Sequence, residues 1–253
     1  MSVQSPISND ESLLNDGERL DDLQVEGFKI IQKPGAFMFG TDAVLLSDFV
    51  MLKSNSKIID LGTGTGIIAL LLAAHNPGIS VDAVELNPVM AEMAARSVLL
   101  NNACDSVRVH NIDLRGAALT LGRGVYDAVV CNPPYFEGGS ALKPKNEIRT
   151  QAKLLNDLTL SDVCLSAFEL LKTGGRFSVV FPAQRLNDLM TAMELSRLAP
   201  KRIRTVHYNI NKPPRLILLD AVKEGGRQLE WLPPLILKNI DGTDSAEWKR
   251  IYG

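Results

Sequence analysis

The sequence predicts an α/β fold, with a mostly parallel, doubly wound sheet of seven strands and a small N-terminal extension. Three observations predict it. Short apolar segments alternate with helical segments from residue 57 onward. A glycine-rich turn follows the first apolar segment, and polar residues follow four successive ones. Because open α/β sheets bind ligands at the carboxyl ends of their strands, these polar residues mark the expected site.

Segments rich in Val, Ile and Leu give the expected strands. They cover residues 57–61, 80–84, 107–110, 126–131, 176–181, 203–208 and 216–222. Apolar residues at helical spacing give the expected crossover helices. These cover residues 67–72, 88–100, 160–171 and 184–195. Parallel strands joined by helical crossovers form a sheet that is covered on both faces.

Length and composition bound the organisation of the chain. With 253 residues, 45% of them hydrophobic, it can bury one substantial core. We expect an N-terminal extension over residues 1–55, the α/β domain over 56–225, and a tail over 226–253 that is packed on the domain or exposed. The longest apolar run has eight residues, too few for a membrane span. The three cysteines and three histidines are widely spaced, which predicts neither a disulfide framework nor a metal site. A cytoplasmic protein is expected.

The N-terminal extension carries weaker signals. We expect a short helix over residues 18–23 and a hairpin of residues 28–32 and 36–39 around a Pro-Gly turn. A helix is expected to begin at Thr41 or Asp42, because either side chain can cap its first turn.

Charge is unevenly distributed along the chain. Residues 1–138 hold 9 Lys and Arg against 17 Asp and Glu, a net charge of −8, and residues 139–253 hold 18 against 12, a net charge of +6. The basic second half fits a polyanionic partner, and ordinary solvated charge explains it equally well. The candidate phosphate contacts are Lys143, Lys145, Arg149, Arg202, Arg204, Lys212 and Arg215. Residues 212–215 also fit a plain turn.

The glycine-rich turn covers residues 60–66, between the first strand and its helix. Its glycines allow a tight turn and close approach of a ligand to the backbone. The dinucleotide fingerprint G-x-G-x-x-G requires a third glycine where Ile67 stands, so the spacing excludes that fingerprint. Asp60 suits a cationic aminoacyl group better than a pyrophosphate. A purely structural turn is the alternative.

Two further acids follow strands. Glu85 ends the second strand, where a carboxylate can accept both hydroxyls of a ribose. Asp113 follows the third strand and can accept a hydrogen bond from an adenine amino group. Each alone also fits a solvated loop acid or a helix cap. Their order along successive strand ends favours one ligand site.

The fourth strand ends in Asn132-Pro133-Pro134-Tyr135. Prolines stop the strand, because they cannot donate to a sheet ladder. The Asn132 side-chain oxygen and the Pro133 carbonyl can then accept both hydrogens of a planar amine, while Tyr135 stacks on the ring that carries it. A plain strand end at two prolines is the alternative reading.

This order of motifs resembles the class I, Rossmann-like methyltransferases that use S-adenosylmethionine, in the amino-methylating branch with an N-P-P-Y motif. Residues 19–23, 39–46 and 171–184 are similar to bacterial tRNA adenosine N6-methyltransferases that modify the adenosine following the anticodon of a valine tRNA. The resemblance implies a monomeric or homodimeric enzyme acting on tRNA. It also implies roles for individual residues. Cofactor binding falls to Phe39, Thr41, Asp42, Asp60, Gly62, Gly64, Glu85 and Asp113, and catalysis to Asn132, Pro133 and Tyr135.

Other functions share parts of this pattern. Protein-glutamine N5-methyltransferases also carry N-P-P-Y, but usually begin with a sizeable helical domain, whereas only residues 1–55 precede the first strand here. A ribosomal RNA guanine N2-methyltransferase is a second enzyme alternative. A non-catalytic module that binds cofactor and RNA is an alternative of another class.

Overall fold

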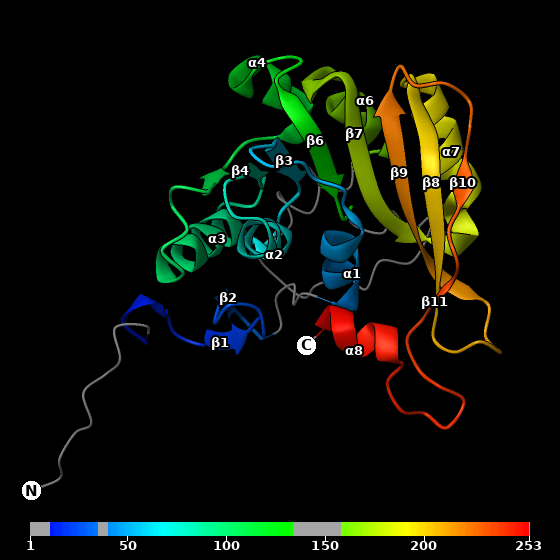
Figure 1. Cartoon of the computed structure of the whole chain (residues 1–253). Helices are drawn as coiled ribbons and strands as arrows, with labels where there is room; N and C mark the ends of the chain where they lie inside the picture. Colours follow the sequence, from blue (N-terminus) through cyan, green and yellow to red (C-terminus); the bar gives the residue numbers. More distant parts are fainter. Residues whose placement is uncertain (1–10, 35–39, 134–157, 253) are drawn as a thin grey trace, which may run out of the picture.

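The computed structural model describes residues 11–34, 40–133 and 158–252 of the chain (Figure 1). All seven expected strands are present. They are β3 (Lys57–Leu61), β4 (Ser80–Val84), β5 (Val107–His110), β6 (Tyr126–Cys131), β7 (Leu171–Pro182), β8 (Leu198–His207) and β9 (Pro214–Lys223). Two further strands, β10 (Glu230–Trp231) and β11 (Leu235–Ile236), were not expected. Two residues are too few to show the alternation that predicts a strand.

The main sheet has the order β10-β8-β9-β7-β6-β3-β4-β5, and β11 also pairs with β8. The strands from β7 to β5 run parallel to one another, and β9 runs antiparallel to both β7 and β8. The chain therefore moves from β3 outward to β5, returns through β6 beside β3, and continues to the other edge. This reversal at β3 and β6 is the position where open α/β sheets bind ligands.

Helices cover both faces of the sheet (Figure 1). On one face lie α1 (Thr41–Phe49), α2 (Ile67–His75), α3 (Pro88–Leu100) and α8 (Ala246–Tyr252). On the other lie η2 (Leu114–Gly116), α4 (Ala117–Leu121), α6 (Leu160–Leu170) and α7 (Leu186–Leu195), the last preceded by η3 (Ala183–Arg185). Along β3, Ile58 faces the first set and Ile59 the second. This period of two is that of a strand buried on both faces, which confirms the doubly wound prediction.

The N-terminal extension differs from the expectation. Residues 19–22 form strand β1 (Arg19–Asp22), paired antiparallel with β2 (Lys29–Gln32), so the helix expected over residues 18–23 is wrong. The strand expected at 28–32 is confirmed, but its partner is β1. The turn between them uses left-handed residues at 24, 26 and 27. The other expected partner, residues 36–39, lies outside the described residues.

The β1-β2 hairpin is fixed to α3. The backbone N–H of Ile31 donates to the Ser97 hydroxyl at 3.0 Å, and that of Lys29 donates to Asn101 Oδ1 at 2.7 Å. Arg96 contacts both carboxylate oxygens of Glu18, at 2.6 and 2.9 Å. A two-stranded hairpin with four residues in each strand is unstable alone, so these contacts explain why strand geometry prevails over local helix propensity.

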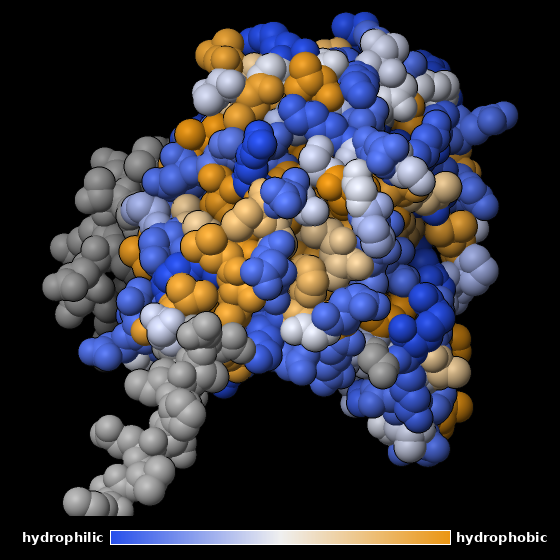
Figure 2. All heavy atoms as spheres, turned by 60° about the vertical axis from the view of Figure 1, so that its left-hand side comes forward, coloured by the Kyte–Doolittle hydropathy of each residue, from blue (hydrophilic) through white to orange (hydrophobic). Residues whose placement is uncertain are grey.

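The described part of the tail lies against the sheet and α1. Trp248 and Ile251 of α8 are buried, and Arg250 pairs with Asp48 of α1 at 3.0 Å. The domain boundaries after residues 55 and 225 remain a prediction. The face drawn in Figure 2 is mostly hydrophilic, with hydrophobic side chains gathered toward its middle. None of the helices in the described ranges is long and apolar enough to cross a bilayer.

Candidate active site

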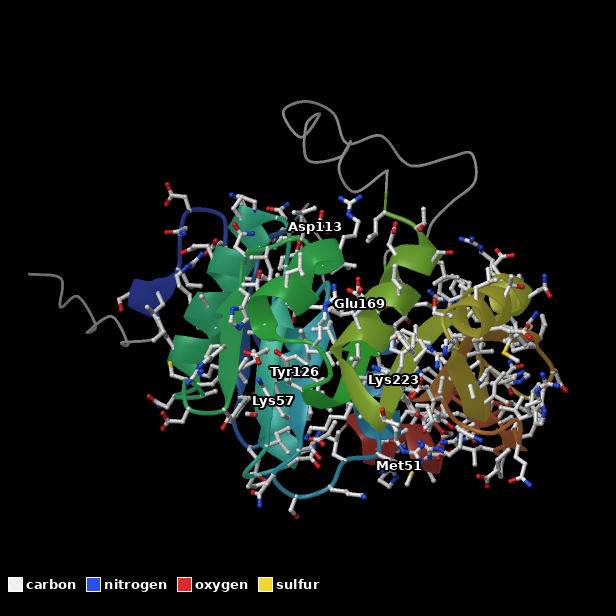
Figure 3. The ribbon with its side chains drawn as sticks, turned by 90° about the horizontal axis from the view of Figure 1, so that it is seen from above. Met51, Lys57, Asp113, Tyr126, Glu169 and Lys223 are labelled. Carbon is white, nitrogen blue, oxygen red and sulfur yellow. The ribbon has the colours of Figure 1, made fainter. Side chains whose placement is uncertain are left out.

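The register of the sheet brings the expected ligand residues together. Leu61 of β3 pairs with Cys131 of β6 and Val84 of β4, and Val84 pairs with His110 of β5. The residues that follow these four are Gly62, Asn132, Glu85 and Asn111. They lie in one row because parallel strands end at the same edge. Figure 3 shows Asp113 on this side of the molecule, with Lys57 and Met51 at the opposite edge.

The glycine turn is held against the end of β4. The backbone N–H groups of Gly62 and Thr63 both donate to the carbonyl of Val84 at 2.9 Å. Gly62 has φ 72°, and a Cβ added there would meet no described atom within 4 Å. Gly66 has φ 91°, and its Cβ would lie 3.3 Å from Ala94 Cβ of α3. Gly66 therefore serves packing, while Gly62 leaves open space where a ligand would lie.

Glu85 is bound to the turn by its side chain. Its Oε2 accepts from the backbone N–H of Gly64 at 2.9 Å, and its Oε1 accepts from that of Asn87 at 2.8 Å. Burial raises the pKa of this carboxyl group, and the two backbone donors oppose the rise. Each oxygen keeps a lone pair that can accept a ribose hydroxyl.

Asp60 is fully buried beneath the turn. Its Oδ2 accepts from the Thr63 hydroxyl at 2.6 Å, and its Oδ1 has no hydrogen-bond partner among the described residues. Burial raises the pKa of Asp60 to about 7, against the Thr63 hydroxyl, and the Glu85 carboxylate adds to the rise. A buried carboxylate with an unsatisfied oxygen fits a cationic ligand group, which would satisfy it and lower its pKa.

Asp113 is at the expected strand end, but it is already paired. Its Oδ1 accepts from the Arg115 backbone N–H at 2.9 Å, which caps η2, and Arg115 Nη2 lies 2.5 Å from its Oδ2. The Arg115 guanidinium holds the pKa of this carboxyl group below its usual range. An adenine amino group would therefore share these oxygens with Arg115.

The acceptor motif and the entry to α1 are partly described. Asn132 is half-buried and Pro133 buried, directly after β6. α1 begins at Thr41 as expected, but its N-cap residue is Gly40, so the expected capping by Thr41 or Asp42 is wrong; the Thr41 hydroxyl donates to Asp42 Oδ1 at 3.3 Å. Phe39 and Tyr135 lie outside the described residues, so their predicted roles stay predictions.

Two polar residues near the site were missed by sequence reasoning. Asn111 donates from Nδ2 to the carbonyls of Glu85 and Leu86, at 2.8 and 3.0 Å, and so fixes the end of β4. Gln32, fully buried on β2, donates to the Thr65 hydroxyl at 3.4 Å. The second bond links the N-terminal extension to the glycine turn, which brings the chain before α1 toward the expected cofactor site.

Two of the candidate phosphate contacts have partners within the protein. Arg202 donates to Asp220 Oδ2 at 3.1 Å and packs on the Phe49 ring, and its side chain is only 17% exposed. Arg204 Nη2 donates to both carboxylate oxygens of Glu247, at 2.8 and 2.9 Å. These pairs disfavour both arginines as RNA contacts. Residues 143, 145 and 149 lie outside the described ranges.

Lys212 and Arg215, in contrast, are exposed. They are therefore the two candidate phosphate contacts that the described structure leaves at the surface.

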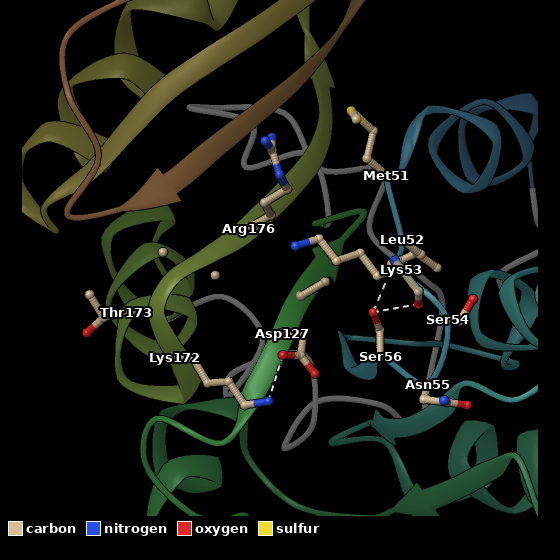
Figure 4. A pocket seen from close by; sticks show the side chains of 13 residues that line it. Met51, Leu52, Lys53, Ser54, Asn55, Ser56, Asp127, Lys172, Thr173 and Arg176 are labelled. Atoms are coloured by element: carbon tan, nitrogen blue, oxygen red, sulfur yellow. Dashed lines mark hydrogen bonds and ion pairs between the residues drawn. The ribbon is translucent and has the colours of Figure 1, made fainter.

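A cavity of about 480 Å³ lies at the other edge of the sheet, between residues 51–56 and 172–176 (Figure 4). Lys172 and Asp127 both line it and pair at 2.6 Å. Because Asp127 is near the amino end of β6, this cavity opens away from the row of strand ends. In the ranges that the structure describes, no group of three or more His, Cys, Asp or Glu residues is placed to hold a metal ion.

Solved structures share this fold. A predicted O-methyltransferase from Agrobacterium tumefaciens superposes with a TM-score of 0.68 at 22% identity, over 83% of this chain and 95% of the other. The Pyrococcus horikoshii protein TYW2, in complex with MeSAdo, gives a TM-score of 0.58 at 14% identity, over 83% and 73%. At these identities the likeness shows the fold alone.

Sequence comparisons identify the family. The methyltransferase small domain family model matches residues 28–195. A tRNA1(Val) (adenine(37)-N6)-methyltransferase from a Flavobacteriaceae bacterium (strain 3519-10) is 31% identical, over 76% of this chain and 80% of its own length. One of the same name from Dickeya chrysanthemi (strain Ech1591) is 32% identical, over 85% and 86%. The chain therefore contains a methyltransferase small domain and belongs to the tRNA1(Val) (adenine(37)-N6)-methyltransferase family.

Proposed function

We propose that this protein transfers the methyl group of S-adenosylmethionine to the exocyclic N6 of an adenosine in tRNA, the adenosine that follows the anticodon. The main support is the row of strand ends at one edge of the sheet, where the open glycine turn and Glu85 lie beside the Asn-Pro end of β6. The names of the relatives supply the substrate.

The residues present fit the methyl donor. When bound, S-adenosylmethionine supplies a methyl group that is activated on a sulfonium centre. The free Oδ1 of Asp60 would take its ammonium group, and Glu85 would take its ribose hydroxyls. Asp113 would accept from its adenine, in competition with Arg115. Phe39, Thr41 and Asp42 would close the site from the N-terminal side.

Asn132 and Pro133 act on the target base. Their two oxygens would accept both hydrogens of the amine, which directs the nitrogen lone pair toward the methyl group and reduces its delocalisation into the purine. Tyr135 would stack on the same base. The nitrogen turns acidic as its fourth bond forms, so its proton can leave to water and no histidine base is required. Positioning therefore provides most of the catalysis.

RNA binding would draw on exposed basic residues of the second half of the chain. Lys212 and Arg215 are the described candidates, together with residues 143, 145 and 149. A target in a single-stranded loop needs little energy to leave its stack. We infer a cytoplasmic enzyme, since its tRNA substrate is there, that acts as a monomer or a homodimer.

The deciding experiment supplies labelled S-adenosylmethionine and bulk tRNA that lacks the modification, followed by nucleoside analysis. Label in N6-methyladenosine is expected. Label in N2-methylguanosine, or in a protein glutamine, would contradict the proposal. Asn132→Ala should abolish transfer while cofactor and tRNA affinity remain. Wild-type protein that binds both and never transfers a methyl group would be a binding module.

A further inference from the structure

The turn between β8 and β9 lies at the same edge of the sheet as the strand ends. We call residues 208–213 the Tyr208 loop. β8 ends at His207 and β9 begins at Pro214, and Leu216 pairs with Pro182 at the carboxyl end of β7. β7 runs parallel to β6, and only β7 separates β6 from β9. The register pairs Cys131 with Val179 and Val179 with Leu219, so β9 lies about 10 Å to the side of β6. The Tyr208 loop, which ends at residue 213, lies several residues further along the strands than the Asn-Pro motif.

The Tyr208 loop exposes apolar side chains beside cationic ones. Tyr208 is 54% exposed and Ile210 is 58% exposed. Lys212 within the loop and Arg215 just after it are also exposed. The loop projects beyond the body of the sheet, and the helices of the described ranges do not cover it (Figure 1). An aromatic and an aliphatic side chain are therefore presented to solvent beside two positive charges.

The backbone of this loop is fixed by hydrogen bonds. The carbonyl of Tyr208 accepts from the backbone N–H of Lys238 in the tail, at 2.8 Å. His207 Nδ1 donates to the carbonyl of Lys212 at 2.8 Å, because a carbonyl can only accept. The backbone N–H of Lys212 donates to the Asn209 carbonyl at 3.1 Å. These bonds fix the backbone at Tyr208 before a ligand binds, so less conformational entropy is lost on binding.

The chemistry of this surface fits single-stranded RNA. Unpaired bases stack on aromatic side chains, with about 1–3 kcal/mol per base, while nearby Lys and Arg contact the phosphates. We propose that Tyr208 stacks on an unpaired base in the same RNA loop as the methylated one, with Ile210 against the same base and Lys212 and Arg215 on the backbone. This inference rests on the proposed RNA substrate, and it adds a second base-binding position to it.

The test compares Tyr208→Ala, Tyr208→Trp and the matched control Trp231→Ala. Trp231 is 63% exposed on β10, the outermost strand, so it controls for loss of any exposed aromatic ring. The probe is an anticodon stem-loop RNA that carries the target adenosine, assayed for Kd, KM and kcat. Tyr208→Ala should raise Kd and KM about tenfold, within the range of one lost stacking contact, with kcat little changed. Tyr208→Trp and Trp231→Ala should bind as the wild type does.

Salt dependence separates stacking from charge. Tyr208→Ala should leave the slope of log K against log salt unchanged, whereas Arg215→Gln should reduce it by about one. Ile210→Ser provides a second variant of the same surface and should also weaken binding. Unchanged affinity of both Tyr208→Ala and Ile210→Ser would overturn the inference, as would an equal loss in Trp231→Ala.

The Tyr208 surface could instead bind a second copy of the protein, and the same variants test this alternative. If the wild type is a dimer that Tyr208→Ala converts to a monomer at unchanged RNA affinity, the surface binds a second copy and the inference is wrong. Methylation of the stem-loop by the wild type reports separately on the proposed function. Absence of any transfer would refute that function, whereas transfer with equal affinity of the variants would refute only the stacking role.

Discussion

Alanine variants of two glycines in the same turn, Gly62 and Gly66, should rank in opposite orders for stability and for ligand binding. Both Gly62 and Gly66 have positive φ, so either alanine costs about 1–2 kcal/mol of unfolding free energy for the left-handed backbone alone. At Gly62 the added methyl group meets no described atom. At Gly66 it lies 3.3 Å from Ala94 Cβ, and overpacking adds about 1–3 kcal/mol. Gly66→Ala should therefore be the less stable variant.

The ranking of the two variants should reverse for their affinity for S-adenosylhomocysteine, the product formed from the cofactor. The methyl group of Gly62→Ala would occupy the space beside the strand ends, and we expect its affinity to fall at least about tenfold, or 1.4 kcal/mol. Folded Gly66→Ala should bind as the wild type does. Urea denaturation gives the first ranking, and titration calorimetry below the unfolding transition gives the second. Equal affinity of Gly62→Ala and the wild type would refute the placement of the ligand.

Three further predictions concern charged side chains. Because the folded pKa of Asp60 is raised to about 7, its contribution to the unfolding free energy should fall as pH rises from about 4 to 7. In pH-dependent urea denaturation the wild type should therefore lose stability relative to Asp60→Asn over this range. Arg96→Ala leaves the Glu18 carboxylate with only the Asn15 backbone N–H as a donor among the described residues and should lower the unfolding free energy by about 2 kcal/mol. Reversal of Lys212 and Arg215 to Glu should weaken tRNA binding at low salt, measured by filter binding, with cofactor affinity unchanged.

The Arg96 prediction has a matched control, and each of the other two has an outcome that would contradict it. The double variant Arg96→Met with Glu18→Gln removes both charges and should recover much of the lost stability, because a neutral pair leaves no buried charge. An unchanged pH profile in Asp60→Asn would show that another group titrates. Charge reversal that leaves tRNA affinity intact at low salt would remove Lys212 and Arg215 from the RNA surface.

Much of the fold and of the site could be predicted because the signals are local. β3 is an apolar run followed by glycines, and β6 an apolar run that ends at prolines, so each strand end shows in a few residues. Parallel register then brings the ends together without further information. Strand β1 could not be predicted, since its conformation depends on pairing with β2 and docking on α3.

The hydrogen-bond and ion-pair partners of polar residues also could not be predicted from the sequence. Arg202 pairs with Asp220 and Arg204 with Glu247, 18 and 43 positions away, so the sequence shows two basic residues where the structure has closed ion pairs. Asn111 has no local signal either, because its bonds reach the end of a different strand. A basic residue in a sequence is therefore a phosphate contact only where the fold leaves it without an acidic neighbour.

The two short strands of the tail also affect how the protein behaves in solution. β8 has ten residues and β9 on one side, and on its other side it pairs with β10 and β11. Without that cover, β8 would present a long row of unpaired backbone groups, a template for strand addition by another chain. The tail thus guards against aggregation, and a chain cut after residue 225 would be prone to form insoluble assemblies even with every ligand-binding group intact.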